Sequence, residues 1–354
     1  MTSKERVRAA FAHAAVDRVP AAFEAVSVVN RRLLAHYGLP DHEALLRHFE
    51  IDTRYPAVDY TGPTLPAYTD ADGYEVTASW WGTYSRSVWT GKEYHGQIVR
   101  RPLDAARTLA ELQEFRWPDP DDFDYEGFGR GLDRWPDRAI VVGHAGPFQM
   151  ATALRSMESL FIDMALEPEL AHFVYDRMVA FELEHYERLF EAAGGRIDVL
   201  RVHDDYGTQR SLLLSVPMWR QFFARNTRRL TELAHAYGAF YLQHSCGAVA
   251  DVIPELVGCG VDGLEPVQKV AGLEPEKLKA AWGSELLFHG GIDTQGVLPF
   301  GSVEDVRRET RHYIDTLAAD GSGYILMASQ AFEGDVPLEN IEALYAVSRV
   351  PGTG

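Results

Sequence analysis

The chain has 354 residues, of which 46% are hydrophobic, and its formal net charge at pH 7 is −18. This length suits one large α/β barrel or two smaller domains, and the core can be large enough to fold without disulfides. The negative charge argues against a protein that binds nucleic acid, because phosphates require a basic surface. It also weighs mildly against a highly anionic substrate.

Cysteine content and the N-terminal segment bear on the compartment. The two cysteines of the chain, Cys246 and Cys259, are too few for a disulfide framework. Residues 1–15 are charged and helix-like and contain no apolar signal core. No apolar run approaches the roughly 20 residues that span a membrane. We therefore expect a cytoplasmic protein that does not bind membranes.

The first part of the chain contains two strand-like segments and an unusual insert. Residues 18–23 and 53–58 have the composition of strands in a buried sheet. Residues 66–102 instead place aromatic side chains among Thr, Ser and Gly, which predicts an inserted β-hairpin or lid. This insert could be a structural flap, an aromatic wall for the substrate, or the contact surface of a homodimer.

From residue 139 onward, apolar β-rich runs alternate with helical patterns, which is typical of a parallel sheet. With the two early segments, these runs make eight strands, and we predict a single domain, residues 1–354, folded as a (β/α)8 TIM barrel. An open doubly wound sheet is the alternative, but no G-x-G-x-x-G follows an early strand. The later predicted strands are 139–143, 198–202, 239–242, 261–264, 286–288 and 324–327.

Polar side chains follow six successive predicted strands. In an α/β barrel the carboxyl ends of all strands meet at one rim, and active sites lie there. Crowding so many polar groups at this rim would be costly unless they had a function. The predicted rim residues are His144, His203, Asp205, Tyr206, His244, Cys246, Glu265, His289, Asp293, Gln295 and Gln330.

The pattern His244-x-Cys246, followed by Glu265 at the end of the next strand, predicts a metal site. An imidazole and a thiol two residues apart can turn toward one point, and zinc favours nitrogen and sulfur ligands. We expect these three residues to hold Zn²⁺. Two other interpretations stay open: a hydrogen-bonded core histidine beside an inert thiol, and a strand-end salt bridge at Glu265.

Asp204 and Asp205 are adjacent carboxylates at a predicted strand end. Neighbouring side chains on a strand point to opposite sides, so one of the two faces the cavity. That carboxylate could orient a ligand histidine or act as a general base, or it could only cap a loop amide.

Four long segments, 198–209, 243–268, 288–301 and 323–340, resemble the uroporphyrinogen decarboxylase-like superfamily. The likeness runs nearly end to end and is interrupted by the insert at 66–102. It implies a distorted (β/α)8 barrel. It also implies one of two chemistries: metal-free decarboxylation of uroporphyrinogen, or methyl transfer by zinc enzymes that act on corrinoid proteins or coenzyme M.

The resemblance favours the zinc methyltransferase branch, in which an H-x-C motif, an acidic residue and a later cysteine hold zinc. His244 and Cys246 match the motif, and Glu265 falls where the acidic ligand is expected. The later cysteine is missing from 328–330, so water, Gln330 or the substrate could take its place. The arginine-rich segment of the decarboxylase has no counterpart in 21–27.

The leading hypothesis is therefore a zinc-dependent methyl- or alkyl-group transferase acting on a small-molecule or corrinoid-linked substrate. Alternatives are a metal-free decarboxylase, a lyase that uses zinc as a Lewis acid, and a corrinoid-binding or scaffolding partner without catalysis. Asp205, His203 and Gln330 are predicted to be catalytic. The residues predicted to contact substrate are His144, Tyr206, His289, Asp293 and Gln295.

Overall fold

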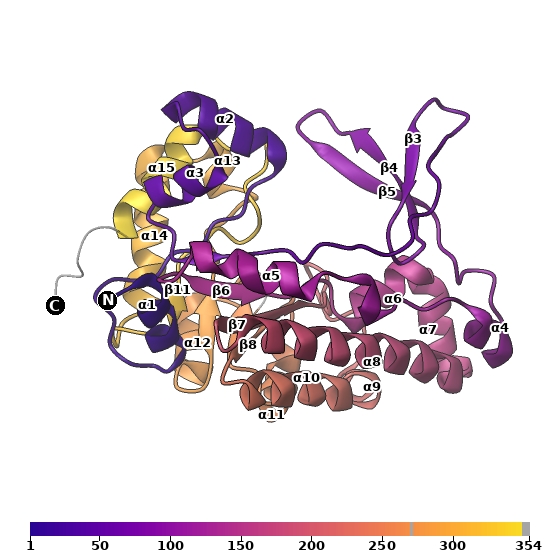
Figure 1. The fold of residues 1–354 in the computed structure, drawn as a ribbon. Helices are drawn as coiled ribbons and strands as arrows, with labels where there is room; N and C mark the ends of the chain where they lie inside the picture. The colour runs from indigo at the N-terminus through magenta and orange to yellow at the C-terminus, as the bar shows by residue number, and fades with distance from the viewer. Residues whose placement is uncertain (270–271, 349–354) are drawn as a thin grey trace.

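The computed structural model describes residues 1–269 and 272–348 and has a curled parallel sheet at its centre (Figure 1). Neighbouring strands in this sheet follow chain order. They are β1 (Thr53–Arg54), β6 (Ala139–Val142), β7 (Ile197–His203), β8 (Phe240–His244), β9 (Gly263–Glu265), β10 (Leu287–His289) and β11 (Tyr324–Ile325).

The segment around Ala21 joins the two edges of this sheet. Ala21 forms a parallel bridge with Leu326, beyond the end of β11. On its other side, the backbone N–H of Asp52 donates to the carbonyl of Ala21 over 2.8 Å. The predicted strand at 18–23 is therefore reduced to a single bridge, and the seven-stranded sheet curls in the manner of a (β/α)8 barrel.

Helices cover the outside of the sheet, as Figure 1 shows. Local sequence defines their ends: α14 begins with a capping box between Ser302 and Asp305, and α8 ends at Gly194 in the left-handed conformation. The covering helices are α5 (Tyr125–Gly131), α6 (Pro147–Leu154), α7 (Met157–Leu166), α8 (Pro168–Ala193), α9 (Val216–Phe222), α10 (Ala224–Ala236), α11 (Ile253–Gly258), α12 (Pro275–Trp282) and α14 (Val303–Leu317).

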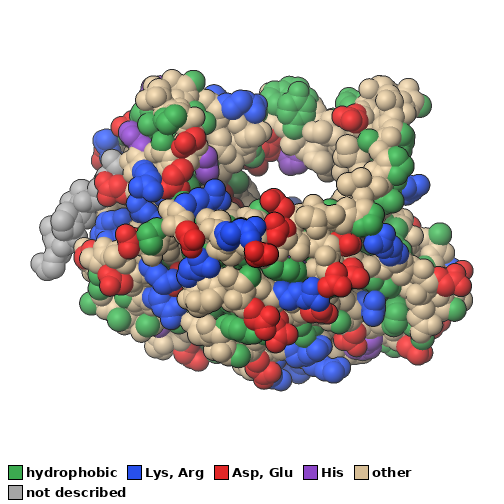
Figure 2. Space-filling view, viewed as in Figure 1, with side chains coloured by type: hydrophobic (Ala, Val, Ile, Leu, Met, Phe, Trp, Pro, Cys, Tyr) green, Lys and Arg blue, Asp and Glu red, His purple; other side chains and the backbone are tan. Residues whose placement is uncertain are grey.

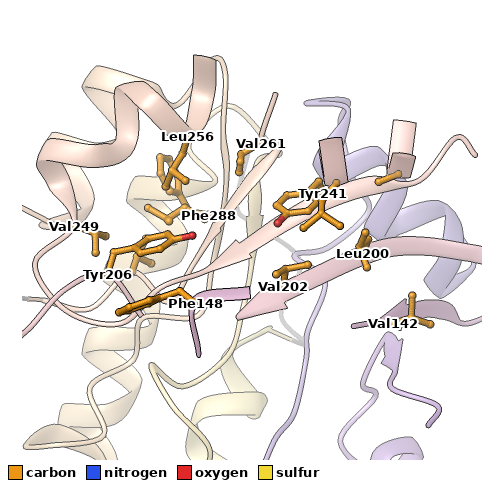
Figure 3. Close-up of a cluster of buried hydrophobic side chains, with 14 of the residues drawn as sticks. Val142, Phe148, Leu200, Val202, Tyr206, Tyr241, Val249, Leu256, Val261 and Phe288 are labelled. Carbon is orange, nitrogen blue, oxygen red and sulfur yellow. The ribbon is translucent and has the colours of Figure 1, made fainter. Parts of the chain in front are cut away.

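The two faces of the sheet have separate apolar clusters, because side chains alternate along a strand. Figure 3 shows part of the outer cluster, whose members include Leu200 and Val202 of β7, Tyr241 of β8 and Phe288 of β10. The inner cluster lies inside the curl and is closed at the amino end by helix α1 (Ser3–Phe11). Its members are Val7, Ala10, Phe11, Ala22, Ala139, Val141, Val199, Leu242, Leu287, Ile325 and Met327.

Two lobes rise above the carboxyl end of the sheet (Figure 1). One contains helices α2 (Ser27–Tyr37), α3 (His42–His48), α13 (Val297–Phe300) and α15 (Leu338–Ser348). The other is an antiparallel sheet formed by the insert, where a β-hairpin was predicted. Its four strands are β2 (Tyr68–Thr69), β3 (Glu75–Ala78), β4 (Tyr84–Trp89) and β5 (Tyr94–Arg100), followed in the chain by α4 (Leu109–Glu114).

A hollow is visible between these lobes and the body of the protein (Figure 2). The tip of the antiparallel sheet contacts a loop on the other side: Lys92 forms ion pairs with Glu333 and Asp335. A Cβ atom added to Gly334 would lie 2.3 Å from the carbonyl oxygen of Lys92, so the two backbones are close. In residues 1–269 and 272–348, no helix is long and apolar enough to cross a membrane.

Candidate functional site

Side chains alternate along each strand, and this alternation places several polar residues on the inner face of the sheet, at the carboxyl ends of its strands. In β7, Arg201 and His203 follow the inner residue Val199 at intervals of two. The same spacing from Leu242 places His244 inside the curl. Strand register aligns His203 with His244, and His244 with Glu265.

His244, Cys246 and Asp205 form a group whose potential metal-binding atoms all lie within 4.8 Å of one another. Nε2 of His244 lies 3.3 Å from Sγ of Cys246 and 3.6 Å from Oδ1 of Asp205. Gly247 makes the turn with a φ of 89°, and its N–H donates to Gln268. We call these three residues the His244–Cys246–Asp205 group.

The two adjacent aspartates point in opposite directions, as predicted from their places at a strand end. Asp205 faces the group, where its Oδ1 accepts from the backbone N–H of Cys246 over 2.8 Å and its Oδ2 accepts from Gln149. Asp204 is buried on the other side and accepts from the backbone N–H of Gln149 at the start of α6. Burial raises the pKa of Asp204 to about 7.

Glu265 lies on the far side of the His244 ring from Cys246. Arg201 contacts both of its carboxylate oxygens, with Nε 2.5 Å from Oε2, and Arg201 also pairs with Glu24. Oε1 of Glu265 lies 3.6 Å from Nδ1 of His244 and 3.6 Å from Nδ1 of His289. The carboxylate that lies near both His244 and Cys246 is thus that of Asp205. Glu265, the predicted acidic ligand, instead faces Nδ1 of His244.

Three further predicted histidines lie around this centre with depressed pKa values. The ring of His203 stacks on that of His244 at a centroid distance of 4.5 Å. Burial and the charge of Arg201 lower the pKa of His203 to about 2, and burial lowers the pKa of His144 to about 4. Burial also lowers the pKa of His289. These imidazoles are therefore neutral at pH 7.

Gln330, in the segment that follows β11, also contacts the His244–Cys246–Asp205 group. Its side-chain amide contacts Sγ of Cys246. Backbone hydrogen bonds hold this segment beside residues 24–26: the N–H of Phe332 donates to Glu24 and the N–H of Val26 donates to Phe332. Gln330, which was one predicted replacement for the later cysteine of the family, thus contacts Cys246.

Three predicted substrate contacts lie elsewhere. Tyr206 is buried in the outer cluster, where it packs against Phe148 (Figure 3) and its hydroxyl donates to Asp204. Asp293 accepts from the backbone N–H groups of Gln295 and Val297 and so caps the following turn. Gln295 is exposed. Each of these side chains has a structural role or a surface position, because the loop geometry turns it away from the inner face.

Arg201, Glu24 and Gln149 were not predicted as site residues. The signal for Arg201 was present, since it stands two residues before His203 and therefore shares its face. Glu24 lies in the segment 21–27, whose lack of arginine argues against the decarboxylase branch, and its own carboxylate had no sequence signal. Gln149 lies on α6, and its contact with Asp205 depends on the loop between β6 and α6.

Comparisons with known proteins agree with this architecture. A family model described as Uroporphyrinogen decarboxylase (URO-D) matches residues 104–349. Methylcobamide:CoM methyltransferase MtaA of Methanosarcina barkeri is 24% identical over 211 residues, which is 60% of this chain and 58% of that enzyme. The same enzyme from strain Fusaro matches to the same extent, so the chain spans little more than half the length of these relatives.

A solved structure described as a methyltransferase from Methanosarcina mazei shares the fold. It superposes with a TM-score of 0.66 at 21% sequence identity, and the match covers 98% of each chain. The predicted resemblance to the uroporphyrinogen decarboxylase-like superfamily, with likeness to its methyltransferases, is confirmed.

Proposed function

The chain belongs to the uroporphyrinogen decarboxylase (URO-D) family, and from this premise we propose that it is a zinc-dependent methyl- or alkyl-group transferase. Its acceptor would be a small-molecule thiol, and its methyl donor a corrinoid, free or carried by a protein. The likeness to a methylcobamide:CoM methyltransferase supports this assignment. The observation that carries the proposal is the convergence of His244, Cys246 and Asp205 on one point.

The geometry of the His244–Cys246–Asp205 group suits zinc. In a tetrahedral zinc site with bonds of about 2.0–2.3 Å, ligand atoms lie about 3.3–3.8 Å apart. The distances from His244 Nε2 to Cys246 Sγ and to Asp205 Oδ1, 3.3 and 3.6 Å, fall in that range. One nitrogen, one sulfur and one oxygen form a donor set that zinc accepts, and a fourth position is left for substrate.

Glu265, which the sequence suggested as the acidic ligand, has a different role in this proposal. Its Oε1 lies 3.6 Å from Nδ1 of His244, and that buried nitrogen has no hydrogen-bond partner within residues 1–269 and 272–348. A carboxylate behind a metal-binding histidine selects its tautomer and orients the ring. Arg201 fixes the carboxylate in turn. Glu265 would therefore position His244 rather than bind the metal.

The chemistry requires a thiolate at neutral pH. When bound, zinc supplies a positive centre that stabilises the thiolate form of the acceptor. With Oδ1 of Asp205 directed at the metal, its Oδ2 is left to take the thiol proton and pass it to solvent, since the side chain is 35% exposed. The thiolate sulfur then forms a bond to the methyl carbon while the cobalt–carbon bond breaks, and the electron pair of that bond stays on cobalt.

The antiparallel sheet β2–β5 would act as a cover for the site. Its tip reaches Glu333 and Asp335 through Lys92, and those carboxylates follow Gln330 in the chain by a few residues. Closing a site in this way excludes water from a reactive cobalt centre and holds both substrates in place.

The metal-free decarboxylation of a polycarboxylate is less well supported. Such a substrate needs arginine side chains that are free to bind its carboxylates. In the described part of the chain, Arg201 is the guanidinium beside the His244–Cys246–Asp205 group, and it is already paired with Glu265 and Glu24.

Elemental analysis of protein purified without added metal tests the proposal. We expect about one equivalent of zinc in the natural protein and a sharp loss in Cys246→Ser. Cys259→Ser is the matched control, because Cys259 is buried beside α10 and its thiol contacts the carbonyl of Ala224. A second assay would follow thiol-dependent loss of the methyl group from free methylcobalamin. Equal zinc in all three proteins would contradict the assignment.

A further inference from the structure

Charge around the proposed site is unevenly distributed. We call the solvent-facing rim of the site, lined by Glu24, Asp205, Cys246 and Gln330, the mouth. In the described part of the chain, the contacts of this centre and of the sheet tip place more carboxylates than cations here. Arg201 and Lys92 are each ion-paired with two carboxylates, and Arg32 donates to the carbonyl of Gly334 in the loop that the sheet tip contacts. The carboxylates are Glu24, Asp205, Glu265, Glu333 and Asp335.

The cation nearest the site lies beneath its carboxylates. The side chain of Arg201 is 5% exposed, whereas that of Glu24 is 31% exposed. Arg201 directs Nη1 and Nη2 at Glu24, and Nε and Nη2 at Glu265, so its hydrogen-bonding edges are occupied. A ligand entering the mouth therefore meets the carboxylate of Glu24 before it can reach the guanidinium.

The backbone holds Glu24 in this covering position. The carbonyl of Glu24 accepts from the N–H of Phe332 over 2.9 Å, and Ala25 forms a parallel bridge with Phe332. The backbone thus fixes Glu24 at the entrance, hydrogen-bonded to Phe332, which follows Gln330 by two residues.

We propose that Glu24, by covering Arg201, determines the charge of the substrate, and that the site takes a thiol whose tail is cationic rather than anionic. This inference rests on the proposed thiol-binding function and names its substrate class. An anionic tail would be repelled by the carboxylate of Glu24 and would have to compete with it for Arg201. A quaternary ammonium tail would be attracted by Glu24 across the mouth.

Matched thiols of opposite charge test the proposal. Thiocholine and 2-mercaptoethanesulfonate both place the charged group two carbons from sulfur, and 2-mercaptoethanol is the neutral reference. Their Kd values for zinc-loaded protein would be measured by isothermal titration calorimetry. We expect thiocholine to bind most tightly and 2-mercaptoethanesulfonate most weakly. Because the thiols differ in acidity, the decisive quantity is how the ratio of their Kd values changes in Glu24→Gln.

Glu24→Gln keeps the size of the side chain and removes its charge. The preference for thiocholine over the sulfonate should fall by about three- to tenfold in this variant, as expected for loss of one partly solvated charge. Glu126→Gln, an exposed glutamate on α5, should leave the ratio unchanged.

The outcomes separate this inference from the proposed function. Tighter binding of the sulfonate by the natural protein, or an unchanged ratio in Glu24→Gln, would overturn the charge proposal alone, since a thiol would still bind. Zinc uptake without binding of any of the three thiols would overturn the thiol-binding function, and the inference with it.

Discussion

The guanidinium of Arg201 contacts both carboxylate oxygens of Glu265, and the two side chains are only 5% and 1% exposed. The pair comes from β7 and β9, which are separated in the sheet by β8 and its His244. This arrangement fixes Oε1 of Glu265 behind His244. A buried ion pair of this kind contributes geometry at the site more than net stability.

Replacing Arg201 with Met should destabilise the fold by about 3–5 kcal/mol, because it leaves Glu265 as an uncompensated buried charge. Urea unfolding of the metal-free protein measures this change. Arg130→Met is the control, since Arg130 pairs with Glu126 on the surface within α5. Similar unfolding midpoints for the two variants would show that Glu265 does not depend on Arg201.

Asp205→Ala and Asp204→Ala should separate metal binding from folding. Asp205 faces the His244–Cys246–Asp205 group, so its loss should weaken zinc binding at least about tenfold in a competition titration with a chelator. Asp204 caps α6, so its loss should cost about 0.5–2 kcal/mol of stability and leave zinc affinity within about twofold. The reverse pattern would mean that the roles of the two aspartates are exchanged.

Lys92→Met should loosen the tip of the antiparallel sheet. The ion pairs to Glu333 and Asp335 are partly exposed, so the global stability should change by less than about 1 kcal/mol. Amide hydrogen exchange in residues 84–100 should become several-fold faster, because the tip loses these contacts to the opposite loop. Lys277→Met, which removes a surface pair with Glu274, should leave this exchange unchanged.

Glu182→Gln should change how stability depends on pH. Glu182 is completely buried on α8, neither carboxylate oxygen has a hydrogen-bond partner among the described residues, and burial holds its pKa well above the usual range. The folded state therefore binds the proton more tightly than the unfolded state does. This preference stabilises the fold below the unfolded pKa, about 4.5, and is progressively lost as pH rises above it.

The glutamine variant has no such proton to lose. Its stability relative to the natural protein should therefore increase between pH 5 and pH 8, by about 2 kcal/mol or more. Urea unfolding at several pH values measures the difference. Glu184→Gln, an exposed position on the same helix, should show no comparable trend. A parallel pH dependence of natural protein and Glu182→Gln would rule out a neutral Glu182 in the fold.

The sequence predicted best those features that depend on a short repeat of residues along the chain. Alternating strands and helices indicated the parallel sheet, and seven of the eight predicted strands are present in it, although β1 covers only the first two residues of the predicted 53–58. The opposite directions of Asp204 and Asp205 followed from strand geometry alone. The insert was recognised as β-rich, although its four-stranded pairing depends on contacts between strands that composition does not specify.

By itself, the sequence determined the family, the parallel sheet and the pairing of His244 with Cys246, because each depends on residues close together in the chain. Tertiary structure decided which carboxylate joins them. The register of β7, β8 and β9 places Glu265 where it pairs with Arg201 and lies behind the His244 ring. The turn after β7 places Asp205 beside Cys246, from whose backbone N–H it accepts a hydrogen bond. A charge interaction between strands depends on distances in space, and no spacing along the chain encodes those distances directly.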